Sequence, residues 1–102
     1  MTMLHTVNKS PFERNSLASC LRLAAKGSAV LLIEDAVVGA VKGCSFEKTL
    51  AGALPDVSVS VLGPDLAARG IGEDKLIDGV QVVDYAGFVD LTAENDAVQS
   101  WL

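Results

Sequence analysis

One apolar run constrains the fold of this chain more than any other feature. Residues 29–33 read Ala-Val-Leu-Leu-Ile, and Glu34 follows directly. A strand with apolar side chains on both faces is typical of a parallel sheet that helices cover on both sides. The run is also far shorter than the ~20 apolar residues of a membrane-spanning helix. It therefore predicts a buried parallel strand and argues against a membrane span.

Short apolar runs and helical patterns alternate along the rest of the chain. Further strands are predicted over residues 3–7, 57–62 and 80–83. Helices are predicted over residues 10–26, 36–42, 46–54 and 63–70, and from Asp84 toward a tail that ends in Trp101-Leu102. Such alternation predicts a parallel sheet with right-handed crossovers. We therefore expect an α/β fold: a single three-layer α/β/α domain over residues 1–102, with a mainly parallel sheet of about four short strands. The strand order stays open between 2-1-3-4 and the sequential arrangement.

Local signals mark the first predicted helix. Ser10 and Glu13 have the spacing of a capping box, and Pro11 occupies the favoured first helical position. A restart at Asn15 is the alternative beginning, and Gly27 ends the helix.

The core is expected where helix and strand patterns meet. Leu17 and Leu21 share one side of the first predicted helix, and Leu32 lies inside the apolar run. In the last predicted helix, Asp84 is the cap and Phe88 belongs to the apolar stripe. We expect Leu21 and Leu32 to be buried.

Charge is divided unevenly along the 102 residues. Residues 1–50 carry six Lys or Arg and four Asp or Glu, whereas residues 51–102 carry two and nine. Such an acidic C-terminal half repels a phosphate backbone, so direct nucleic-acid binding is not expected. The acidity serves either solubility or a basic partner. The first residues lack the basic segment of a signal peptide, which predicts a cytoplasmic protein.

Cysteine and histidine are sparse. Cys20 and Cys44 lie 24 residues apart and fit no CxxC, zinc or haem motif. In a reducing cytoplasm both are expected to be free thiols. His5 is the one histidine of the chain and is expected to be a core residue with its hydrogen bond satisfied. No metal site is predicted, and the absence of a GxGxxG motif argues against a dinucleotide cofactor.

Cys20 is the candidate for sulfur chemistry, because a thiolate can accept sulfur as a persulfide. Reactivity requires a lowered pKa, usually from a helix N-terminus or a nearby cation. The helical neighbours of Cys20 supply no cation, and its position is past the first turn of a helix that starts at Asn15. The local residues therefore favour a small packing residue over a nucleophile. If Cys20 does carry sulfur, we expect a partly accessible secondary site that alkylates slowly.

Four segments together resemble one known family. They are Leu4-His5-Thr6-Val7-Asn8-Lys9-Ser10-Pro11, Leu31-Leu32-Ile33-Glu34-Asp35, Leu62-Gly63-Pro64-Asp65-Leu66-Ala67-Ala68-Arg69-Gly70 and Val83-Asp84-Tyr85-Ala86-Gly87-Phe88-Val89-Asp90-Leu91. Each segment alone is weakly specific. Their joint occurrence, in order and over nearly the whole chain, is similar to the DsrH/TusB family.

The resemblance implies a subunit of a cytoplasmic sulfur-relay complex, with a DsrEFH-like fold. Partners would be DsrE/TusD-like and DsrF/TusC-like subunits, two copies of each in a heterohexamer, together with TusA-like and DsrC-like sulfur carriers. Such a complex passes persulfide sulfur between proteins, and its principal cysteine is on the DsrE/TusD subunit. The chain would thus belong to a sulfurtransferase complex without being its main catalytic subunit.

The position of Cys20 matches the first-helix cysteine of Dsr-type members, which favours oxidative sulfur metabolism and makes Cys20 a candidate secondary persulfide site. Two alternatives stay open: a TusB-like subunit for 2-thiolation of wobble uridine in tRNA, and a free-standing flavodoxin-like ligand-binding module. Cys44 matches no motif of the family.

Overall fold

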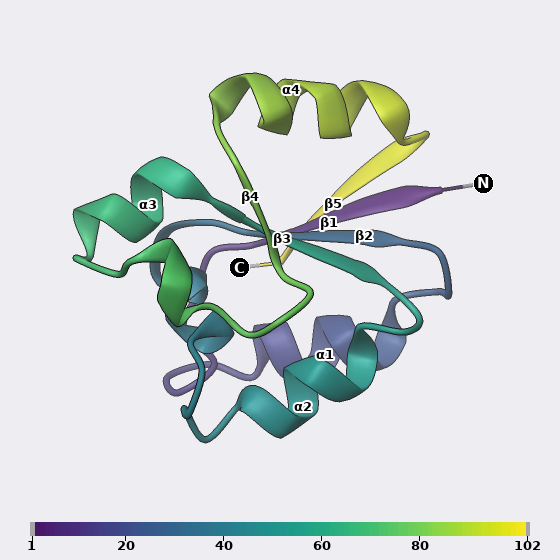
Figure 1. Cartoon of the computed structure of the whole chain (residues 1–102). Coiled ribbons are helices and arrows are strands. Elements are labelled where there is room, and N and C mark those ends of the chain that lie inside the picture. Colours follow the sequence, from purple (N-terminus) through teal and green to yellow (C-terminus); the bar gives the residue numbers. More distant parts are fainter. Residues whose placement is uncertain (1, 102) are drawn as a thin grey trace.

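A computed structural model describes residues 2–101 and contains a five-stranded sheet. The strands are β1 (Met3–Val7), β2 (Ala29–Leu32), β3 (Ser58–Leu62), β4 (Gln81–Val83) and β5 (Ala97–Trp101). All paired strands are parallel, in the order β4-β3-β2-β1-β5 (Figure 1). The predicted α/β class is confirmed, and the sequential arrangement of the first four strands is the correct one.

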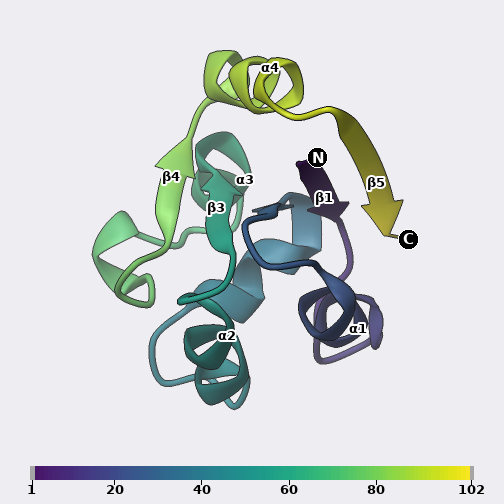
Figure 2. The same ribbon diagram turned by 90° about the vertical axis from the view of Figure 1, so that its right-hand side faces the viewer.

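Helices lie on both sides of this sheet. The α-helices are α1 (Ser16–Leu23), α2 (Glu47–Ala53), α3 (Gly63–Ala68) and α4 (Tyr85–Glu94), and the 3-10 helices are η1 (Glu34–Ala40) and η2 (Glu73–Lys75). Figure 2 shows α1 and α2 on one side of the sheet and α4 on the other. This arrangement is the expected three-layer architecture. None of the helices within residues 2–101 is long and apolar enough to cross a membrane.

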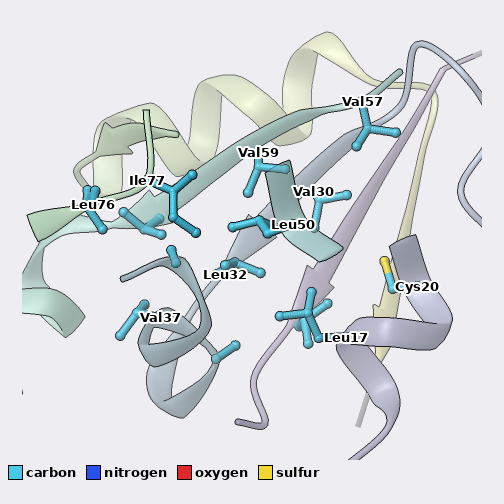
Figure 3. Packing of buried hydrophobic residues seen from close by; sticks show 14 of the residues in the cluster. Leu17, Cys20, Val30, Leu32, Val37, Leu50, Val57, Val59, Leu76 and Ile77 are labelled. Atoms are coloured by element: carbon cyan, nitrogen blue, oxygen red, sulfur yellow. The ribbon is translucent and has the colours of Figure 1, made fainter. Parts of the chain in front are cut away.

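The two faces of the sheet are covered unequally. The larger buried cluster lies on the side of α1 and α2, and side chains from β1, β2 and β3 enter it (Figure 3). Leu32 is fully buried there, as expected, whereas Leu21 is partly buried at its margin. On the α4 side, the buried cluster is small and consists of Leu4, Ala29 and Leu31. The sheet is therefore anchored mainly by one of its faces.

The first helix begins later than the capping box predicts. The Ser10 hydroxyl accepts a hydrogen bond from the Phe12 N–H at 3.1 Å, but the chain then forms only a turn, and α1 starts at Ser16. A long-range contact explains the difference. A Cβ on Gly39 in η1 would lie 2.8 Å from Cγ of Pro11, so the missing side chain lets the Pro11 ring pack closely against η1. The alternative restart near Asn15 is thus the better prediction.

A fifth strand replaces the tail expected after the last helix. β5 pairs with β1, with Leu4 opposite Val98 and Thr6 opposite Ser100. The Thr6 and Ser100 hydroxyl oxygens lie 3.3 Å apart in a hydrogen bond. Because the chain returns over the opposite face through α4, β5 joins the free edge of β1 rather than that of β4. The expected strand count is therefore one short.

Candidate functional site

Cys20 lies in the middle of α1 and is fully buried. Its side chain points from α1 toward the sheet and belongs to the larger buried cluster, together with Leu17 from the same helix (Figure 3). Burial raises the pKa of the Cys20 thiol to about 12. The thiol is therefore protonated at neutral pH and is a poor nucleophile in this conformation. The expectation of a partly accessible side chain is wrong, because α1 turns this position directly onto the sheet.

Cys44 has a different environment, in the turn between η1 and α2. It is a free, half-buried thiol whose Sγ lies 3.7 Å from the carbonyl oxygen of Gly39. The neighbouring turn is fixed by a hydrogen bond from the Gly43 N–H to the Glu47 carboxylate. Cys44 is thus more accessible than Cys20, although the hydrogen bonds described around it supply no activating base.

His5 on β1 is paired with Trp101 on β5. The indole Nε1–H donates a hydrogen bond to His5 Nδ1 at 3.0 Å, and the ring centroids lie 6.1 Å apart. Since Nδ1 accepts this bond, the neutral ring carries its proton on Nε2. Burial lowers the pKa of His5, which favours the same neutral form. The expectation of a buried, hydrogen-bonded histidine is confirmed, and the pair fastens the edge strand β5 to the sheet.

A hollow of about 280 Å³ adjoins this pair. Its lining consists of Met3, His5, Leu23, Ala25 and Ser28, from β1 and from the end of α1 and the turn after it. Most of these side chains are uncharged and apolar, so the hollow suits an apolar group with one hydrogen-bonding atom. A larger hollow of about 410 Å³ lies at the amino ends of the strands, around Asp56 and Gly79. Parallel α/β sheets usually bind ligands at the opposite edge.

The carboxyl ends of β2 and β3 carry a network of charged groups that sequence reasoning missed. Arg69, directly after α3, donates to the Asp35 carboxylate at 2.8 Å and to the backbone oxygen of Asp65 at 3.1 Å. The Asp65 carboxylate accepts the Glu34 N–H at 2.7 Å. The signal was present, because Glu34-Asp35 and Asp65 each follow a strand and parallel strands end at the same edge. Arg69 is engaged in holding η1 to α3, so the network is structural.

The part of the chain that the structure describes contains no cluster of metal ligands. Within residues 2–101, no group of three or more His, Cys, Asp or Glu side chains is arranged to hold a metal ion. The two cysteines lie apart: Cys20 belongs to the larger buried cluster, and Cys44 lies in the turn between η1 and α2. The two thiols are therefore held in different parts of the fold.

Comparisons with known proteins bear on the whole chain. A profile of the family described as DsrH like protein matches residues 9–98. Protein TusB of Shigella flexneri is 34% identical over 99 residues, which are 97% of this chain and 100% of that protein. Protein TusB of Escherichia coli strain K12 shows the same identity and coverage.

Solved structures with the same fold include the ychN protein from E. coli. It matches with a TM-score of 0.81 and 23% identity, over 99% of this chain and 100% of that one. MTH1491, a protein of unknown function from Methanobacterium thermoautotrophicum, matches with a TM-score of 0.76 and 19% identity, over 97% and 96% of the two chains. At these identities the two structures bear on the fold alone.

Proposed function

Because this chain belongs to the DsrH-like protein family, we propose that it is a subunit of a complex that relays persulfide sulfur between protein carriers. The observation that carries the proposal is the family match over residues 9–98, together with relatives that are 34% identical over nearly the full length. A cytoplasmic location and a single functional domain over residues 1–102 are part of the proposal.

The partners we propose are a DsrE/TusD-like subunit and a DsrF/TusC-like subunit, in a heterohexamer with two copies of each chain. TusA-like and DsrC-like proteins would deliver and accept the sulfur. Cys20 favours the branch that serves oxidative sulfur metabolism, because its position matches the first-helix cysteine of Dsr-type members. The names of the similar proteins favour the other branch, which serves 2-thiolation of tRNA.

Assembly tests the proposal most directly. The chain is co-expressed with the DsrE-like and DsrF-like subunits of the same organism and analysed by size-exclusion chromatography with mass detection. We expect one species that contains all three chains in equal amounts. Co-expression with an unrelated flavodoxin-like protein is the matched control. Elution of this chain as a lone monomer beside its partners would contradict the proposal and favour a free-standing module.

Cys20 is proposed as a secondary persulfide site that is loaded only in the assembled complex. In the transfer, the Cys20 thiolate attacks the outer sulfur of a donor persulfide. The donor S–S bond breaks, a Cys20 S–S bond forms, and the donor leaves as a thiol that takes the proton Cys20 has lost. The buried thiol with its raised pKa cannot begin this reaction unless α1 opens or a partner brings a cation to it.

Mass spectrometry after incubation with a small persulfide donor tests this role. We expect no gain of one sulfur atom on Cys20 in the isolated chain, and slow gain in the complex. Cys44→Ser serves as the control that keeps the Cys20 signal free of the accessible thiol. Loading of isolated Cys20 as fast as the DsrE-like cysteine would contradict its secondary rank. If the complex never loads Cys20, and Cys20→Ser leaves sulfur transfer intact, the residue has a packing role only.

A further inference from the structure

The outer side of α4 exposes more apolar surface than the fold requires. Tyr85 and Val89, one helical turn apart, are 61% and 64% exposed. Figure 1 shows α4 across the sheet from α1 and α2, and none of its residues is fully buried. Val98 of β5 is 50% exposed and lies opposite Leu4, which belongs to the buried cluster on the α4 side. Three exposed apolar side chains thus share one side of the sheet.

Other residues hold α4 in place. Phe88 and Leu91 pack against the small cluster on the sheet. The Asp84 carboxylate caps the helix by accepting the Gly87 N–H at 2.8 Å. A Cβ on Gly87 would lie 2.8 Å from Cβ of Val83, so the first turn lies directly on the end of β4. Tyr85 and Val89 contribute little to this anchoring, so they can be replaced without removing the contacts that hold α4 on the sheet.

Acidic residues flank these apolar side chains along the chain, and no ion pair neutralises them among the described residues. Asp84, Asp90, Glu94 and Asp96 are all exposed, and none forms an ion pair with another described residue. The chain contains no Lys or Arg after Lys75. A second copy of the chain placed on this face would bring like charges together, which opposes self-association. A partner with Lys or Arg around an apolar patch would be attracted, because an apolar centre with a charged rim is the usual anatomy of an interface.

We propose that Tyr85, Val89 and Val98, here called the α4 patch, dock on a partner protein whose apolar surface is bordered by Lys and Arg. The inference rests on the proposed function for the identity of that partner, which is a subunit of the relay complex. It goes further by assigning the surface of this chain that the subunit covers and the chemistry that the subunit must present. Tyr85 and Val89 provide the apolar contact area. The acidic residues nearby orient the basic partner and raise the rate of its association.

The test uses the double variant Tyr85→Ser/Val89→Ser and measures its affinity for the purified DsrE-like and DsrF-like subunits by isothermal titration. We expect binding to weaken by about tenfold or more, because exposed aromatic and aliphatic side chains at an interface centre carry much of its affinity. Phe12→Ser is the matched control, since Phe12 is 53% exposed but lies in the turn that precedes α1. It should bind as the wild type does.

Charge is tested in the same assay. Asp90→Lys should weaken binding, Glu73→Lys on η2 should leave it unchanged, and rising NaCl should weaken binding of the wild type. Thermal unfolding of each variant controls for folding. If the wild type binds neither subunit at any salt concentration, the proposed function fails and this inference with it.

Two results would overturn the inference alone. The first is wild-type affinity of the Tyr85→Ser/Val89→Ser variant for subunits that the wild type binds. The second is self-association of the isolated chain that this variant abolishes, because the patch would then bind a second copy.

Discussion

At the residue scale, burial decides the chemistry of two titratable side chains on the α1 side of the sheet. It raises the pKa of Cys20 to about 12 and lowers the pKa of His5, so both groups are neutral at pH 7. The sequence predicted a free thiol and a satisfied histidine. It could not predict how deeply Cys20 is buried, because that depends on how closely α1 packs on the sheet.

His5 gives the stability of the protein a predictable dependence on pH. The unfolded chain takes up a proton near the usual pKa of 6.5, whereas the folded chain resists it because burial lowers the pKa. Folded and unfolded chains are both neutral at His5 above that pH, so stability falls only as the pH drops below it. We expect the free energy of unfolding to decrease by at most about 1.4 kcal/mol between pH 6.5 and 5.5, because the unfolded chain can bind at most one additional proton at His5 over this one pH unit.

Urea unfolding at these pH values, followed by the fluorescence of Trp101, measures this effect. His5→Gln is the control: its side-chain oxygen can accept the indole N–H but does not titrate, so its stability should change less over the same interval. Equal slopes for the wild type and His5→Gln would show that the His5 proton is not linked to folding.

At the element scale, local sequence signals predict the start of a helix correctly where the helix directly follows a strand. They fail where a contact between residues far apart in the sequence determines the local conformation. Gly63-Pro64 after β3 and Asp84 after β4 begin helices as the sequence predicts. The Ser10 capping box fails, because the contact between Pro11 and Gly39 holds that segment as a turn. β5 was missed because an edge strand with mostly exposed residues needs no continuous apolar run.

The α4 cap provides a prediction at this scale. Asp84→Ala removes the acceptor of the Gly87 N–H and should lower stability by about 0.5–2 kcal/mol. Because α4 has no fully buried residue, we expect the first turn of α4 to exchange its amide hydrogens faster before the sheet is affected. Hydrogen exchange followed by mass spectrometry resolves the two regions. Asp90→Ala, an exposed change within the same helix, is the control, and the α4 amides of this variant should exchange as slowly as in the wild type. If the α4 amides of Asp84→Ala also exchange at the wild-type rate, the capping role of Asp84 is wrong.

At the scale of the whole molecule, the path of the chain through the sheet determines which elements cover each of its faces. The chain passes from β1 to β4 along one direction of the sheet and returns through α4 to place β5 beside β1. The first described residue lies beside the start of β5, with the Thr2 N–H donating to the Asp96 carboxylate at 2.9 Å and the Asp96 N–H donating to the Thr2 oxygen at 3.1 Å. The face covered by α1 and α2 therefore carries most of the core, and the face under α4 carries the smaller cluster.

This unequal division predicts that stability depends on the α1 side of the sheet. Leu32 is fully buried there, so Leu32→Ala should lower the free energy of unfolding by about 2–5 kcal/mol. Folded domains have about 5–15 kcal/mol in total, so this loss is a substantial fraction of the stability. Leu23→Ala, at a position that is 66% exposed, is the control and should have a near wild-type urea midpoint. If the two variants unfold at the same urea concentration, the core does not lie where α1, α2 and β2 meet.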